Sequence, residues 1–208
     1  ELPLVDFVVP ILHSFAAMLV AIVLHIILHE GGHLLMGLAT GYRFSSFRIA
    51  SIAFVRKDGQ IRVRRYKLAG TGGQCLMLPP EMPLEQVPFF WYNAGGVIMN
   101  VVFALFPLVL LMKCNLIVWW SSWCIMMVIV GLSLAVLNGI PMRLGGMQND
   151  GMNILILFRT PEKRKDFVRQ LQIAVTATEG KRVSEMPAEW FDSDSVDDYR
   201  ELLRLASR

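Results

Sequence analysis

Three long stretches without a charged side chain constrain the fold of this chain more than any other feature of its sequence. With histidine counted as neutral, the stretches run from Phe7 to Leu28, from Val87 to Met112 and from Leu116 to Ile140. An α-helix needs roughly 20 apolar residues to cross the hydrocarbon core of a bilayer, and each stretch is long enough. We therefore expect an α-helical polytopic membrane protein, with spans at about 10–39, 87–112 and 116–140.

The charged residues, only 18% of the chain, indicate how these spans are oriented. Basic side chains gather after the first stretch, at Arg43, Arg48, Arg56, Lys57, Arg62, Arg64, Arg65 and Lys67. They gather again after the third stretch, at Arg143, Arg159, Lys163, Arg164, Lys165 and Arg169. Loops rich in lysine and arginine remain on the cytoplasmic side. We expect the N-terminus outside and the C-terminus in the cytoplasm, and the lipid bilayer rather than a nucleic acid explains the net charge of +3.

The loop between the first two spans has the pattern of a β-hairpin at about residues 47–68. The segments 47–56 and 61–68 are rich in β-branched and aromatic residues with partial alternation. Between them lies Asp58-Gly59, a pair that strongly favours a tight hairpin turn. We expect a cytoplasmic β-hairpin here, followed by an irregular return to the membrane from Thr71 onward.

The residues after the third span divide into a short helix and a tail. The apolar run at about 151–158 is too short to cross a bilayer, so we expect a short helix that leads out of the membrane. From residue 160 the composition is that of a soluble segment, with helices expected to about Thr178 and again from about Val196. The sequence thus predicts a transmembrane core over 1–159 and a short cytoplasmic helical tail over 160–208.

The first span contains His29-Glu30-Gly31-Gly32-His33, which is an HExxH pattern. Residues four apart lie on one face of a helix, so His29 and His33 can bind one zinc ion while Glu30 takes a proton from water. The pattern also arises by chance in unrelated proteins. Ionisable side chains within a membrane span are unfavourable, however, and are functional candidates by default. The context therefore favours a metal site.

A catalytic zinc ion usually has three protein ligands and one open position. His25 lies about 12 Å from His33 along a helix axis, too far for both to bind one ion, so we interpret it as a supporting or packing residue. The acidic residues near the membrane are Asp6, Glu81, Glu85 and Asp150. Asp150 is on the same side as His33, but an aspartate at the start of a helix is also a common N-cap. The residues alone leave both interpretations of Asp150 open.

Two further motifs follow HExxH in order along the chain. The second span contains Ala94-Gly95-Gly96-Val97-Ile98-Met99-Asn100, and the third ends in Asn138-Gly139-Ile140-Pro141, with Asp150-Gly151 beyond it. This ordered set, over about residues 10–158, resembles the site-2 protease family of intramembrane zinc metalloproteases. The resemblance implies a three-helix transmembrane core and zinc as the cofactor. It also implies His29, His33 and Asp150 as metal ligands, Glu30 as the catalytic residue and Asn138 as a substrate-binding residue.

Two features depart from the family pattern. Gly95-Gly96 stands where the family usually has Gly-Pro, and more residues separate Pro141 from Asp150 than in the family. The shape of that loop, and with it the role of Asn138, depends on how the extra residues fold. We expect Asn100 to pack or form a hydrogen bond between helices, as polar residues in membranes commonly do.

The resemblance implies hydrolysis of peptide bonds in membrane-spanning protein or peptide substrates, for regulated intramembrane proteolysis or the maturation of peptide signals. It also implies a bacterial cytoplasmic membrane. The alternative is a non-catalytic membrane scaffold or substrate-binding relative of the same fold, against which the intact HExxH argues. The edge of the hairpin at 47–68 either pairs an unwound substrate by strand addition or is a structural cover. The sequence indicates no oligomeric state.

Overall fold

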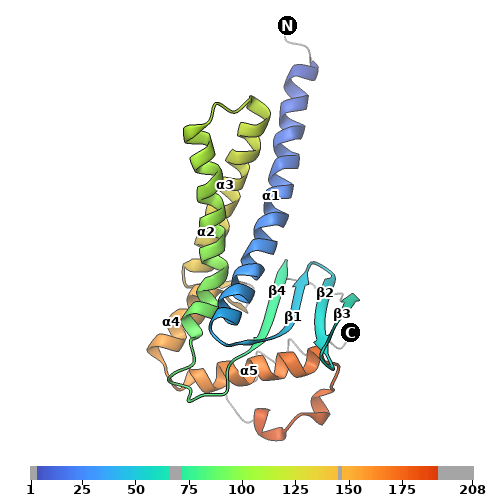
Figure 1. The fold of residues 1–208 in the computed structure, drawn as a ribbon, viewed down its shortest axis with the longest axis vertical. Coiled ribbons are helices and arrows are strands. Elements are labelled where there is room, and N and C mark those ends of the chain that lie inside the picture. Colours follow the sequence, from blue (N-terminus) through green and yellow to red (C-terminus); the bar gives the residue numbers. More distant parts are fainter. Residues whose placement is uncertain (1–3, 66–71, 145–146, 192–208) are drawn as a thin grey trace.

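Three long helices dominate the molecule (Figure 1). The structure is a computed structural model that describes residues 4–65, 72–144 and 147–191. The long helices are α1 (Leu4–Ala39), α2 (Phe89–Lys113) and α3 (Val118–Gly139). Each is long and apolar enough to cross a membrane, which confirms the prediction of a mostly helical protein with three helices of membrane-spanning length. Helix α1 begins earlier than the predicted start at about residue 10.

Small residues bring the three helices close together. Gly32 of α1 lies against Gly95 of α2 so closely that a Cβ atom on either residue would overlap the backbone carbonyl of the other. Ala21 of α1 is fully buried, whereas Phe7 and Phe106 point outward and are 69% and 65% exposed. Contacts between small residues and an outward apolar surface are typical of helices that pack in lipid.

An antiparallel sheet of four strands follows α1 along the chain. Its strands are β1 (Arg43–Ile49), β2 (Ile52–Lys57), β3 (Gln60–Arg65) and β4 (Gly73–Leu78). Their order in the sheet is β3-β2-β1-β4, so that β3 and β4 are the two terminal strands. Strand β1 pairs with β2 on one side and with β4 on the other.

The predicted hairpin is present in part, as the pair of β2 and β3. Asp58 and Gly59 both have a positive φ, of 52° and 77°, as the predicted tight turn requires. The predicted strand over 47–56 is interrupted at Ala50, whose φ of 49° reverses the chain between β1 and β2. Residues 66–68, the end of the second predicted strand, lie outside the described residues.

The expected irregular return to the membrane was wrong for residues 73–78, which form β4. Gly73-Gln74-Cys75-Leu76-Met77-Leu78 does not alternate between apolar and polar residues, because Cys75, Leu76 and Met77 are all buried. Its pairing with β1 joins segments that are distant in sequence. A search for strands in which apolar and polar residues alternate misses such a segment.

The chain beyond α3 forms a short strand pair and two helices. The strands are β5 (Arg143–Leu144) and β6 (Met147–Gln148), and the helices are α4 (Asp150–Arg159) and α5 (Lys163–Thr178). Short 3-10 helices follow at Val183–Glu185 and Ala188–Phe191. Helix α4 occupies the place of the short helix predicted at about 151–158. The helix predicted from about Val196 lies outside the described residues.

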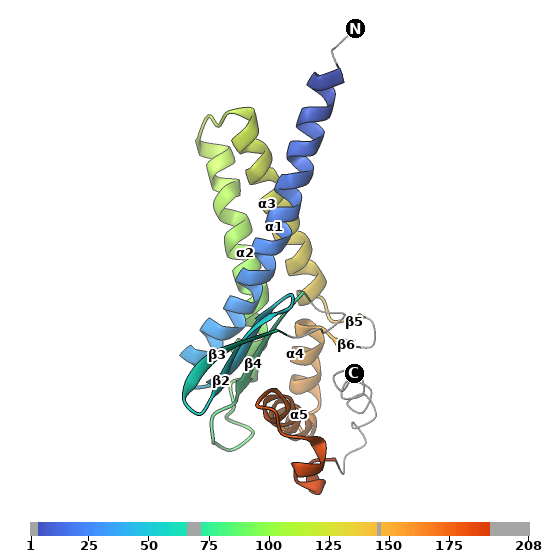
Figure 2. The same ribbon diagram turned by 90° about the vertical axis from the view of Figure 1, so that its right-hand side faces the viewer.

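Helix α5 packs against the sheet. Its buried residues Leu171 and Val175 join Tyr42, Met77 and Tyr92 in one apolar cluster. The sheet, α4 and α5 thus gather at one end of the three long helices, while the first turns of α1 lie at the opposite end (Figure 1, Figure 2). The C-terminal third of α1, which carries the HExxH motif, lies at the end where the sheet is.

Candidate metal centre

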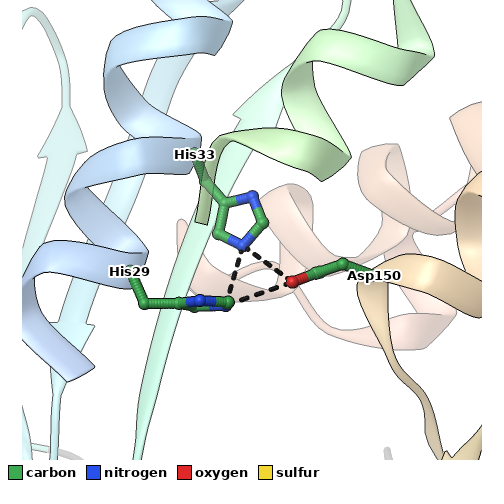
Figure 3. Close-up of side chains that lie close together, drawn as sticks. All are labelled: His29, His33 and Asp150. Atoms are coloured by element: carbon green, nitrogen blue, oxygen red, sulfur yellow. Dashed lines mark hydrogen bonds and ion pairs between the residues drawn. The ribbon is translucent and has the colours of Figure 1, made fainter. Parts of the chain in front are cut away.

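Two histidines of α1 and one aspartate of α4 point toward one another (Figure 3). His29 Nε2 lies 3.1 Å from His33 Nε2. Asp150 Oδ2 lies 3.1 Å from His29 Nε2 and 3.4 Å from His33 Nε2. The structure therefore brings together the three residues that the sequence resemblance implied as metal ligands.

The spacing of these three atoms fits a zinc ion. Zinc binds imidazole nitrogen and carboxylate oxygen at about 2.0–2.1 Å with tetrahedral geometry, which separates two ligand atoms by about 3.3 Å. The observed separations are 3.1, 3.1 and 3.4 Å. In addition, Asp150 Oδ2 is buried and accepts no hydrogen bond from the residues that the structure describes. The nearby imidazole nitrogens pair with this oxygen only when they carry a proton, so with neutral rings the buried charge lacks a partner, which is unfavourable. A cation between the three atoms would stabilise it.

The hydrogen bonding of His33 also suits a metal ligand. His33 Nδ1 lies 2.7 Å from the carbonyl oxygen of Tyr92, and a carbonyl oxygen can only accept a hydrogen bond. The neutral ring therefore carries its proton on Nδ1, and Nε2 presents a lone pair to the cluster. Histidines that bind metals commonly donate from their second nitrogen to a carbonyl or a carboxylate in this way.

The carboxyl group of Asp150 is held in its charged form. Burial alone would raise the pKa of Asp150, but when the imidazoles of His33 and His29 are protonated, their charge and hydrogen bonds outweigh burial and hold this pKa well below its usual range. Since a carboxylate must be ionised to bind a metal, the charge of Asp150 suits a ligand.

Asp150 is free to face the histidines because its neighbour caps the helix. Asn149 is the N-cap of α4, and its Oδ1 accepts a hydrogen bond from the backbone N–H of Met152 at 2.9 Å. Its Nδ2 donates to the carbonyl oxygens of Leu137 and Ile140 at the end of α3. Of the two interpretations that the residues left open for Asp150, the N-cap interpretation was therefore wrong.

The loop between Pro141 and Asp150 is drawn together by backbone pairing. Strands β5 and β6 pair antiparallel, and the backbone N–H of Asn149 donates to the carbonyl oxygen of Met142 at 3.2 Å. This pairing brings Arg143-Leu144 beside Met147-Gln148, and Gly151, next to Asp150, packs against Gly139 at the end of α3. The departure in spacing is therefore compatible with a ligand at Asp150.

A cavity of about 800 Å³ adjoins the three side chains. Glu30 lines this cavity and is 9% exposed, but it is not among the residues whose ligand atoms converge. Asn138 lines the cavity from α3, where its Nδ2 donates to the carbonyl oxygen of Leu134 at 2.9 Å. One cavity thus combines a possible metal site, a buried carboxyl group and a side-chain amide.

The other candidate ligands from the sequence lie elsewhere. Glu81 forms an exposed ion pair with Arg43 at 2.9 Å, and Glu85 is exposed in the loop before α2. Asp6 is in the first turn of α1, at the far end of the helices. His25 is fully buried one turn before the motif, and it is not part of the converging group.

Cys75 of β4 also lines the cavity, as a neutral thiol. Burial, with a smaller contribution from Glu30, raises the pKa of Cys75 above its usual range. Because the thiolate is the nucleophile and the metal ligand, Cys75 does not suit the role of a catalytic cysteine.

Sequence reasoning missed the residues that shape the site around its ligands. A Cβ atom on Gly73 would lie 2.5 Å from Glu30 Cγ, and one on Gly96 would lie 2.5 Å from His29 Cε1. Tyr92 acts through its backbone carbonyl, which leaves no signal in the sequence. Gly96 had a signal, since it belongs to the second motif, but its contact with His29 needs the packing of two helices.

Gly96→Ala is expected to weaken zinc binding by roughly tenfold or more, the lower range for disturbing the support of a metal ligand. The added Cβ would lie 2.5 Å from His29 Cε1 and 2.6 Å from His29 Nδ1, so the ring must move. Gly31→Ala is the matched control, because no atom lies within 4 Å of its added Cβ. Equilibrium zinc titration of both purified variants is the measurement. Equal affinities would contradict the position of His29 against α2.

No protein-family model, curated protein or solved structure matches this chain. The function must therefore be inferred from the geometry and chemistry of the site itself.

Proposed function

We propose that this protein is a zinc-dependent intramembrane endopeptidase. The observation that carries the proposal is the convergence of His29, His33 and Asp150 in a cavity that Glu30 also lines. Three protein ligands leave one position of a tetrahedral zinc ion open, as in catalytic rather than structural zinc sites. The cavity adjoins helices of membrane-spanning length, which favours substrates that are themselves embedded in the bilayer.

Each residue of the site has a specific role in this proposal. Zinc held by His29, His33 and Asp150 would supply Lewis acidity, which lowers the pKa of water and polarises a peptide carbonyl. Glu30 is the general base that takes a proton from the attacking water and then delivers it to the leaving amine. The carbonyl oxygen of Tyr92 holds the ring of His33 in place through the hydrogen bond to Nδ1.

The order and packing of the motifs support membership of the site-2 protease family. The second motif lies against HExxH through the contact of Gly95 with Gly32. Gly151 of the third motif packs against the backbone of Gly139, at the end of α3. Three motifs that are separate in sequence thus surround one cavity, which is the arrangement that this family assignment requires.

The substrates in this proposal are membrane-spanning segments of proteins or peptides, bound as unwound strands. Strand β4 is a terminal strand of the sheet, and its residues Gly73, Gln74 and Cys75 line the cavity. An unwound peptide can pair with such an edge through backbone hydrogen bonds. The edge strand of the predicted hairpin, β3, is at the other side of the sheet. We therefore assign substrate pairing to β4 and the role of a cover to the hairpin.

Asn138 is proposed to hold the substrate from the other side of the cavity. Its Nδ2 donates to Leu134 within the same helix, which fixes the side chain and leaves its amide oxygen as an acceptor for a substrate N–H. In this proposal, the scissile bond lies between β4 and the end of α3.

The protein is further proposed to lie in a bacterial cytoplasmic membrane with the sheet on the cytoplasmic side. The basic residues that follow α1 and α3 are at the same end as the sheet, as the distribution of positive charge requires. Single cysteines at Lys57 and Lys165, in a background without native cysteine, should resist an impermeant thiol reagent in intact cells, while one at Asp6 should react. Labelling at Lys57 from outside would reverse this orientation.

The experiment that tests the proposed function is hydrolysis of a labelled transmembrane peptide by the purified protein in lipid. We expect cleavage with zinc, loss of cleavage after chelation, and recovery when zinc is restored. The alternative function, a non-catalytic scaffold that binds membrane segments, predicts peptide binding without cleavage under all three conditions.

A further inference from the structure

A buried chain of hydrogen bonds links His29 to α3 through two other side chains. His29 Nδ1 lies 3.2 Å from the amide of Asn100, and the other end of this amide lies 3.1 Å from His25 Nδ1. His25 Nε2 lies 3.0 Å from the carbonyl oxygen of Met127. His25 and Asn100 are both fully buried. Polar groups buried among apolar helices are stable only when their hydrogen bonds are made, so this chain constrains where its protons lie.

The carbonyl group of Met127 determines which atoms donate and which accept in this series of hydrogen bonds. Its carbonyl oxygen can only accept, so the proton of His25 is on Nε2. A neutral imidazole has one N–H, so His25 Nδ1 must accept a hydrogen bond, and only the NH2 group of Asn100 can donate it. The amide oxygen then faces His29 Nδ1 and accepts a hydrogen bond from it. His29 Nε2 is left with a lone pair that points to the metal cluster.

The opposite orientation of Asn100 is much less favourable. In the structure, Oδ1 is the atom nearer His25 and Nδ2 is the atom nearer His29. With the amide in this orientation, His25 must donate from both ring nitrogens, which makes it a cation. A cation in a fully buried position whose two partners are an amide and a carbonyl is strongly disfavoured. A half-turn of the amide exchanges its two ends and lets every member of the chain remain neutral.

We propose that Met127, His25 and Asn100 form a tautomer relay that fixes the proton of His29 on Nδ1. Asn100 and His25 are then positioning residues for the ligand His29, as the carbonyl oxygen of Tyr92 is for His33. The purpose of the relay rests on the proposed zinc site. The proton positions, in contrast, are properties of the metal-free protein and can be measured without activity.

Gly131 packs against the ring of His25, and its replacement tests the relay from a helix that does not carry His29. A Cβ atom on Gly131 would overlap His25 Cε1 and lie 2.7 Å from His25 Nε2, so Gly131→Ala must move the ring away from Met127. Gly131 is on α3, whereas His29 is on α1. The added Cβ would also lie 2.9 Å from Cβ of Ala104 on α2, so an effect on zinc binding is assigned to the relay only when the ring signals of His29 change with it.

The direct test is magnetic resonance of the metal-free protein in lipid, with isotope-labelled histidine. The ring shifts distinguish a proton on Nδ1 from one on Nε2, and single replacements of His13, His25 and His33 assign the signals. We expect His29 to carry its proton on Nδ1 and His25 on Nε2, and we expect Asn100→Leu to remove the preference at His29. A wild-type His29 with its proton on Nε2 would overturn the relay.

Zinc titration is the second measurement. It separates a packing role of Asn100 from a role in the relay, because the two roles predict different zinc affinities for two replacements of this residue. Asn100→Leu should weaken binding by roughly 10- to 100-fold, the cost of losing a partner of a metal-bound histidine. Asn100→Asp keeps an acceptor for His29 Nδ1, and its second oxygen can share a proton with His25 Nδ1 whether that proton is on the carboxyl group or on the ring, so this variant should bind zinc much like the wild type. Equal losses in the two variants would mean that Asn100 only packs, and would overturn the relay.

Gly131→Ala should weaken binding in the same direction, and Ser133→Ala, at an exposed position of the same helix, should not. Unchanged zinc affinity and unchanged His29 signals in Gly131→Ala would also overturn the relay. A wild-type protein that binds no zinc would overturn the proposed function, while the magnetic resonance experiment would still decide the relay.

Discussion

Hydrolysis by the Glu30→Gln variant is expected to fall by roughly 10²- to 10⁴-fold, the usual contribution of a general acid–base residue, while its zinc content remains that of the wild type. Glutamine has nearly the size of glutamate but cannot take a proton from water. Glu30 lines the cavity and is not among the three converging side chains. Its replacement therefore leaves the proposed ligand set intact.

The cleavage rate and zinc content of Glu30→Gln are best measured on one preparation. Glu85→Gln is the matched control, because Glu85 is an exposed glutamate in the loop before α2, and it should retain full activity. Wild-type turnover in Glu30→Gln would show that another group takes the proton. Loss of zinc together with activity would instead make Glu30 a ligand.

Asp150→Ala is expected to lower zinc affinity by roughly 100-fold or more, beyond the usual cost of losing a group that only supports a ligand, and to abolish hydrolysis. Two imidazoles alone make an incomplete site. The fold should survive, because the cap of α4 and the link to α3 are made by Asn149 and not by Asp150.

Two further replacements separate a ligand role for Asp150 from a general electrostatic one. Asp150→Glu keeps the charge but extends the side chain, so it should recover part of the zinc occupancy and little turnover, since the metal would shift relative to Glu30. Asp58→Asn is the control for loss of an acidic group. Asparagine tolerates the positive φ of 52° at that turn, so this variant should keep wild-type zinc occupancy and turnover. Full zinc occupancy and activity in Asp150→Ala would exclude it as a ligand.

The helices of this fold were predictable because a bilayer permits few alternatives. A charged side chain within a span is unfavourable, so the uncharged stretches from Phe7 to Leu28 and beyond locate the helices. The turn at Asp58-Gly59 was predictable for a similar reason, since few residue pairs adopt its backbone conformation readily. Strand β4 was not predictable, because Cys75, Leu76 and Met77 are buried by α5 and α2 as well as by the sheet, and these contacts are distant in sequence.

The candidate site was predictable to the extent that its chemistry is local. His29, Glu30 and His33 are within one helical turn, so their relation follows from helix geometry. Asp150 required the family resemblance, because from its position alone it was equally a helix cap. Asn149 decides that question through hydrogen bonds to Leu137 and Ile140, which depend on how α3 and α4 meet. The partner of His33 is a backbone carbonyl, which no sequence pattern reveals.

Metal analysis of the purified wild-type protein, combined with X-ray absorption spectroscopy, tests the central claim most directly. The proposed site predicts about one zinc ion per chain, with nitrogen and oxygen neighbours at about 2.0–2.1 Å and the scattering pattern of two imidazoles. A variant with alanine at His29, His33 and Asp150 should hold little zinc. A wild-type protein with no more zinc than this variant, or zinc bound by sulfur, would contradict the claim that these three residues form a catalytic metal centre.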